Sequence, residues 1–135
     1  IRDYKVTGVQ TCALPISKKK ALLLIDRVLS TAMVNTKNPD SITFFFSDTY
    51  RFYFLMSFML EHFNENEISQ EYAISLVPKK FASRIKRLQV LKQAVQLGYI
   101  DEETSKSDRR RRIYKPSEQM ISDFYEYADN AVTDL

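Results

Sequence analysis

The sequence has few of the residues that carry covalent, metal-binding or phosphate-loop chemistry. Its 135 residues include one cysteine, one histidine, two glycines and no tryptophan. Cys12 and Gly8 both fall within the first sixteen residues. Disulfides, thiolate chemistry and cysteine-ligated metals are therefore excluded for Ser17–Leu135, as are glycine-rich phosphate loops. A chain without cysteine is compatible with the reducing cytoplasm, so we expect a cytoplasmic protein.

Residues 1–16 resemble translated adapter sequence rather than natural protein sequence. Val6–Ile16 matches a translated short-read sequencing adapter, and Ile1–Asp3 fits the adapter sequence just upstream. We expect residues 1–16 to be an artefact outside the fold rather than a natural extended arm. Because the true N-terminus would then be missing, the sequence carries no information about an export signal. Residues 17–135 are enough for one compact domain.

Charge is unevenly distributed along the remaining chain. Without residues 1–16, 18 basic and 16 acidic residues remain, a net charge of +2. Pro78–Lys115 alone carries +8, whereas residues 17–77 carry −1 and residues 116–135 carry −5. A basic centre between neutral and acidic flanks predicts one surface that meets a polyanion.

The first half of the domain is predicted to be mainly helical. Apolar residues recur at helical spacing over residues 17–34. Residues 41–46 are predicted to be a short apolar strand or an extended approach to the next helix. A helix capped by Ser47 or Asp48 then runs to about Phe63 and is apolar on nearly every side. We interpret it as a central core helix, because Asp48, Arg51 and Glu61 interrupt any membrane-spanning run.

The basic centre has the order of a helix-turn-helix. Ser69 is predicted to cap a short helix, and Pro78 fits the first turn of a longer one that ends near Leu97. One face of this longer helix is predicted to be an apolar stripe facing the core. The stripe consists of Phe81, Ile85, Leu88, Leu91 and Val95.

A β-hairpin is predicted to follow. Gly98 is suited to end the helix, because the residue after a helix usually needs a positive φ. The pairs Tyr99-Ile100 and Ile113-Tyr114 are β-prone and flank a polar loop that ends in Arg109–Arg112. Asp108 is predicted to pair with one of these arginines.

A last helix is predicted to begin near Ser117 and reach Leu135, with an acidic outer face. A helix with an apolar stripe of its own so late in a small chain often forms a partner surface. The alternative is that this helix and the helix at residues 17–34 simply pack on their own domain. The predicted parts are residues 17–47, an N-terminal helix and link; residues 48–116, a winged helix; and residues 117–135, a C-terminal helix.

Residues 48–135 resemble the MarR-like winged helix-turn-helix regulators, a bacterial-type family. Leu97-Gly98-Tyr99-Ile100 resembles the family's end-of-helix signature, and Asp108-Arg109-Arg110 resembles its wing motif. The resemblance implies a mainly α fold (α+β) with a two-stranded wing, and a homodimer formed by the N- and C-terminal helices. It also implies a recognition helix in the major groove of double-stranded DNA and a wing on the backbone or minor groove. The family often binds small effectors, but no residue here is assigned to such a pocket.

The candidate DNA-contacting residues lie on the wing and on the recognition helix. Guanidinium groups make bidentate phosphate contacts and enter a narrow minor groove. N-terminal residues of a recognition helix approach the bases. The alternatives are a solvated charge run and ordinary exposed charge on an amphipathic helix. The candidates are Arg109, Arg110, Arg111 and Arg112 on the wing, and Lys79, Lys80, Ser83, Arg84 and Arg87 on the recognition helix.

The sequence predicts no enzyme, metal site or cofactor. His62 has no serine or carboxylate partner at a recognisable spacing, so we interpret it as structural. Asp101–Glu103 is interpreted as a solvated wing edge, since successive strand residues point to opposite faces. We therefore expect a DNA-binding transcriptional regulator. Two alternatives stay open: a winged-helix protein-interaction module that docks an acidic partner, and a plasmid or phage replication or partition protein.

Overall fold

A computed structural model describes residues 8–31 and 38–132 of the chain. The chain divides into two units, Ile1–Thr36 and Lys37–Leu135. The first unit contains helix α1 (Gly8–Thr31). This helix begins earlier than the predicted start at Ser17, within the adapter-like segment. The predicted end at Val34 and residues 1–7 lie outside the described residues.

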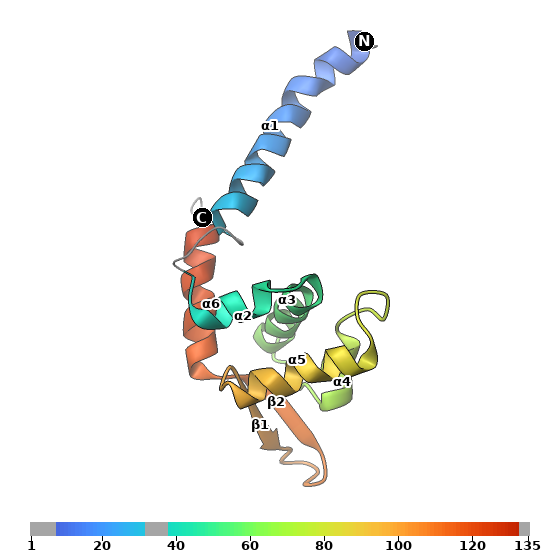
Figure 1. Cartoon of the computed structure of the whole chain (residues 1–135), viewed down its shortest axis with the longest axis vertical. Coiled ribbons are helices and arrows are strands. Elements are labelled where there is room, and N and C mark those ends of the chain that lie inside the picture. Colours follow the sequence, from blue (N-terminus) through green and yellow to red (C-terminus); the bar gives the residue numbers. More distant parts are fainter. Residues whose placement is uncertain (1–7, 32–37, 133–135) are drawn as a thin grey trace. The chain divides into compact units, whose positions relative to one another are not determined.

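The second unit is mainly helical with one small sheet (Figure 1). Five helices and a two-stranded antiparallel hairpin are described in it. The order helix, short helix, turn, helix, hairpin is that of a winged helix-turn-helix, which confirms the predicted fold class. The elements are α2 (Asp40–Phe46), α3 (Thr49–Phe63), α4 (Gln70–Ser75), α5 (Arg84–Gln96), β1 (Ile100–Thr104), β2 (Arg112–Pro116) and α6 (Glu118–Ala131).

Residues 40–46 form a helix, so the predicted strand or extended segment is wrong. The β-prone run of apolar residues pointed to a strand. The buried residues, however, lie at helical spacing: Ser41 and Ile42, then Phe45 and Phe46. Pro39 immediately precedes the first turn, where a missing N–H costs nothing. The Ser41 hydroxyl donates to Asp123 Oδ2 at 2.7 Å, which joins α2 to α6.

One face of helix α3 forms the centre of the core. Phe54, Leu55, Phe58 and Met59 are buried, and the Phe54 ring stacks between those of Phe45 and Phe58. The opposite side is not covered to the same extent: Phe52, Tyr53, Leu60 and Phe63 are exposed. The core position is confirmed, but the burial is one-sided. Over residues 8–31 and 38–132, no helix combines the length and hydropathy that crossing a bilayer requires.

Three serines cap three helices of the second unit. Ser69, Ser83 and Ser117 each accept a hydrogen bond from the backbone N–H three residues later. Such a cap supplies one of the acceptors that the first turn of a helix lacks. Ser69 and Ser117 were predicted as helix starts and are confirmed. Ser83 was not: residues 78–83 form a turn, and α5 begins after it rather than at Pro78.

Gly98 connects α5 to the wing as predicted. Its φ is +84°. Gly98 N–H donates to Val95 O and Tyr99 N–H to Ala94 O, the two bonds of a Schellman motif. The chain then enters β1, which pairs with β2 in the register Glu102 opposite Tyr114. This turn places the hairpin directly after α5.

Helix α6 follows the wing. Met120 is buried in the core, whereas the remainder of its predicted apolar stripe is half-buried or exposed. The predicted end of the stripe, Leu135, lies outside the described residues.

Candidate nucleic-acid interface

The corner between α4 and α5 is held by a buried arginine. Arg87 is 7% exposed. Its Nη1 donates to Ile74 O at 3.0 Å and to Val77 O at 3.3 Å, and its Nε donates to Ser83 O at 3.4 Å. The carbonyls of Ile74 and Val77 belong to the end of α4 and the turn after it, where backbone acceptors lack helical partners. Arg87 was predicted to face DNA; the structure instead uses it to join the two helices.

The inward face of α5 therefore differs from the predicted stripe. Its buried residues are Arg87, Val90, Leu91 and Ala94. Ile85, predicted to be in the core, is 70% exposed, and Phe81 is 44% exposed in the turn before the helix. Leu91 is buried as predicted. The prediction failed at Phe81 and Ile85 because it started the helix at Pro78 and took Arg87 for a surface residue.

The outward face of α5 carries four exposed side chains at spacings of four, three and four residues. Residues with such spacings share one side of a helix. These side chains lie opposite the buried face, and none of them was predicted as a site residue. The signal that could have found them is the Ser83 cap, which fixes where the helix begins. They are Ile85, Gln89, Lys92 and Gln96.

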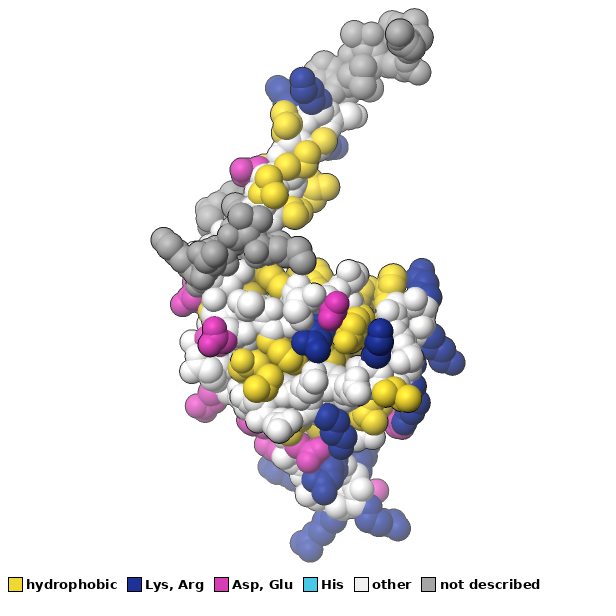
Figure 2. Space-filling view, in the orientation of Figure 1, with side chains coloured by type: hydrophobic (Ala, Val, Ile, Leu, Met, Phe, Trp, Pro, Cys, Tyr) yellow, Lys and Arg dark blue, Asp and Glu magenta, His cyan; other side chains and the backbone are white. Residues whose placement is uncertain are grey.

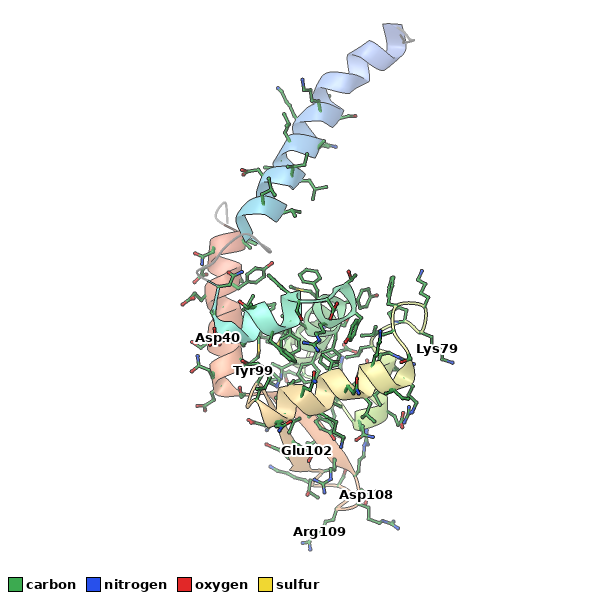
Figure 3. The ribbon with its side chains drawn as sticks, viewed as in Figure 1. Asp40, Lys79, Tyr99, Glu102, Asp108 and Arg109 are labelled. Atoms are coloured by element: carbon green, nitrogen blue, oxygen red, sulfur yellow. The ribbon has the colours of Figure 1, made fainter. Side chains whose placement is uncertain are left out.

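The turn before α5 carries two exposed lysines, Lys79 and Lys80 (Figure 3 labels Lys79). The Lys80 Nζ lies 5.2 Å from the centroid of the Phe81 ring, and this ring contacts that of Tyr53. Within the part of the chain that the structure describes, neither lysine forms an ion pair. Both remain candidates for phosphate contact.

Ser83 and Arg84 are exposed, and each forms hydrogen bonds within the protein. The Ser83 hydroxyl accepts the cap hydrogen bond from the Lys86 N–H. Arg84 makes a bidentate pair with Glu71, at 2.7 and 2.8 Å. The hydrogen bond from Arg84 lowers the pKa of the Glu71 carboxyl, and the same bond raises the pKa of Arg84. Arg84 thus links α5 to α4 on the surface, as Arg87 does in the interior.

The tip of the wing, residues 105–110, holds three exposed cations, Lys106, Arg109 and Arg110. Figure 3 labels Arg109 at this end of the hairpin, and Figure 2 shows Lys and Arg side chains gathered there. Arg110 has 96% of its side chain exposed. Asp108 accepts a hydrogen bond from the Arg110 N–H and lies 3.7 Å from its Nε, which confirms the predicted pairing of Asp108 with an arginine. The loop is closed by Ser105 N–H donating to Arg111 O at 2.8 Å.

The stem of the wing, which we define as Arg111, Arg112 and Lys115, has its cations paired with carboxylates. The Arg111 Nη1 lies 3.3 Å from Glu67 Oε1, and the Arg112 Nη1 lies 2.9 Å from Glu102 Oε1. The Lys115 Nζ lies 3.0 Å from Glu103 Oε2. The four predicted arginines therefore divide into two at the tip and two at the stem. The acidic residues of β1 were interpreted from the sequence as a solvated edge. Two of them, Glu102 and Glu103, instead form ion pairs with Arg112 and Lys115 on β2.

Tyr114 adds a partly buried hydrogen bond to the stem. It is 2% exposed, and its hydroxyl donates to Glu102 Oε2 at 2.6 Å. Burial, followed by this hydrogen bond, raises the pKa of Tyr114 to about 12. Glu102 is thus held by two partners on β2, which fixes the register of the hairpin.

His62 is the remaining titratable candidate from the sequence. His62 is half-buried, and burial and then the charge of Lys115 lower its pKa. Among the residues of the described ranges, no group of three or more histidine, cysteine, aspartate or glutamate side chains could hold a metal ion.

No protein-family model and no curated protein matches the chain. A solved structure described as "Crystal structure of MepR like protein complexed with pseudoligands" is similar to it over 90% of this chain and 71% of that chain. The sequence identity is 14% and the TM-score is 0.41. A similarity at this level decides nothing about the chain, whose fold is described above from its own elements.

Proposed function

We propose that this chain is a DNA-binding transcriptional regulator that binds double-stranded DNA through α5 and the wing. The observation that supports this best is the placement of the exposed cations. Lys79 and Lys80 precede the N-terminus of α5, and the wing that follows α5 ends in Lys106, Arg109 and Arg110. The outward face of α5 lies between these two basic groups along the chain. A helix in the major groove needs cations at both ends to contact the flanking phosphates.

The proposal assigns the phosphate contacts differently from the sequence prediction. Five exposed cations outside α5 and the stem are the main contacts: Lys79, Lys80, Lys106, Arg109 and Arg110. Arg111 and Arg112 contribute less, because their carboxylate partners lie closer (3.3 and 2.9 Å) than Asp108 lies to Arg110 (3.7 Å), and because Arg110 is more exposed. Arg87 makes no contact with DNA in this proposal.

We also propose that the protein acts as a homodimer through its N- and C-terminal helices. Within α1, the apolar side chains from Leu22 to Leu29 are half or more exposed (Figure 2). On α6, Tyr125 and Val132 are 55% and 49% exposed. Two apolar helical surfaces in one chain suit a symmetric interface, in which each copy offers the same patch to its partner.

The test is a salt series with the full chain. Binding to a labelled random-sequence duplex is followed by fluorescence anisotropy between about 50 and 200 mM salt. Neutralising five phosphates predicts a log-log slope of about −4.5, since each contributes about −0.9. Light scattering on the same sample gives the oligomeric state.

The alternative partner is an acidic protein. Polyglutamate that competes as well as duplex DNA at equal charge concentration would favour the protein-interaction module. A folded protein that binds no duplex at about 50 mM salt would contradict the proposed function.

A further inference from the structure

The first two turns of α5 expose an apolar side chain and an amide. Ile85 lies on the first turn and is 70% exposed. Gln89 follows one turn later on the same side and is also exposed. Across the described ranges, no side-chain hydrogen bond is found for Gln89. Gln93, by contrast, accepts a hydrogen bond from Arg51 Nη2 at 3.1 Å. The N-terminal half of the outward face therefore offers one methyl-bearing surface and one uncommitted amide.

Both arginines in this part of the helix are engaged within the protein. Arginine that is bidentate to guanine is the commonest specific major-groove contact. Here Arg84 is bidentate to Glu71, and Arg87 is buried against the carbonyls of α4. The two arginines of the first turn are thus held by the protein, and Ile85 and Gln89 lie on the outward face of the helix.

We propose that α5 reads an A·T-containing step, with Ile85 packed on the 5-methyl group of a thymine and Gln89 hydrogen-bonded to an adenine. This inference rests on the proposed function. Thymine alone among the DNA bases presents a methyl group in the major groove, and glutamine is bidentate to adenine N6 and N7. A four-residue separation on a helix spans roughly 6 Å. That is close to two base-pair steps of about 3.4 Å each, so the two bases lie about two steps apart.

The experiment begins by selecting duplexes from a random library with the full chain. The enriched duplexes are expected to share a thymine and an adenine about two steps apart. Each thymine is then replaced in turn by deoxyuridine, which removes the methyl group alone. At one position the substitution weakens binding about fourfold, the loss expected for one methyl group no longer buried.

The variant Ile85→Ala tests whether this side chain makes the contact. It is expected to bind the thymine duplex about fourfold more weakly than the wild type and to bind thymine and deoxyuridine duplexes equally. Leu60→Ala is the matched control, because Leu60 is 60% exposed on α3. This control keeps the full response to deoxyuridine. Gln89→Ala loses roughly tenfold at the adenine position, the scale of one bidentate base contact.

The outcomes separate the two proposals. Salt-dependent binding with equal affinity for thymine and deoxyuridine duplexes overturns the base-reading inference and leaves DNA binding intact. A response to deoxyuridine that survives in Ile85→Ala also overturns it. Absence of salt-dependent duplex binding overturns the proposed function itself and points instead to a protein partner for the exposed Ile85 surface.

Discussion

The wing tip and the α4–α5 corner use the same residue type for opposite purposes. At the tip, Arg110 has 96% of its side chain in solvent. At the corner, Arg87 is 7% exposed, and three backbone carbonyls accept its hydrogen bonds. The stem lies between these extremes, with each of its cations beside a carboxylate. Formal charge in the sequence is therefore a poor measure of the charge available to a partner.

Breaking the corner is expected to have the largest effect. Arg87→Leu removes every donor that reaches Ile74 O and Val77 O and leaves these buried acceptors unpaired. We expect the free energy of unfolding to fall by about 3 kcal/mol, at about 1–3 kcal/mol for each unsatisfied group. Chemical denaturation measures this loss. Arg87→Lys retains one donor and should lose less; equal stability of the wild type and the leucine variant would contradict the structural role.

Reversing the charge of the tip is expected to affect binding rather than folding. Arg109→Glu combined with Arg110→Glu should weaken duplex binding about 100-fold near 100 mM salt, because two phosphate contacts become repulsions. Exposed substitutions of this kind change stability by no more than about 0.5 kcal/mol. Anisotropy gives the affinity, and thermal unfolding serves as the control.

The matched stem variant sharpens the contrast with the tip. Arg111→Gln combined with Arg112→Gln removes the same number of arginines, but these are already paired with Glu67 and Glu102. We expect a loss of less than about fivefold at the same salt concentration, since fewer counterions are released from the DNA. Equal losses at tip and stem would show that the carboxylates do not restrain the stem arginines.

The smallest effect is expected from the carboxylate that holds the stem. Glu102→Gln removes the negative partner of Arg112 and Tyr114, so the pKa of Tyr114 should fall below about 12 while burial keeps it above the ordinary value near 10. Duplex affinity should rise about twofold as Arg112 is released. The difference in ultraviolet absorbance between each protein and its Tyr114→Phe variant reports the titration of this hydroxyl.

The same tyrosine gives the hairpin a pH dependence at alkaline pH. The folded-state pKa of Tyr114 lies above its unfolded value, so its stabilising contribution is complete below pH 10 and is lost as pH rises through about 12. In Glu102→Gln this loss should begin at lower pH. An unchanged alkaline titration in the variant would mean that burial alone raises the pKa.

Local signals made much of the fold predictable. Ser69, Ser117 and Gly98 each act through hydrogen bonds with near neighbours, so their roles could be deduced from a few adjacent residues. The wing was predictable for the same reason. Residues 40–46 were not, because β-prone side chains became helical through burial against α3 and α6, a tertiary effect.

The candidate site was predictable in its location but not in its individual residues. The face that α5 presents depends on where the helix begins, and Pro78 is a plausible start that the structure does not use. The burial of Arg87 depends on the carbonyls at the end of α4, thirteen residues earlier for Ile74. The pairing of Arg112 with Glu102 depends on strand register. Contacts of this range leave no periodic trace in the sequence.

Because of Arg87, the anchoring of α5 to the domain and the choice of side chains on its outward face are independent of one another. Its contacts anchor the helix from the inside, so the outward positions at 85 and 89 bear no part of that anchoring. Side chains at these two positions can be exchanged while the scaffold keeps its shape. Chains that vary at these two positions would share one fold and differ in the base sequence that we propose α5 to read. The specificity of the helix could therefore change without a change in its anchoring.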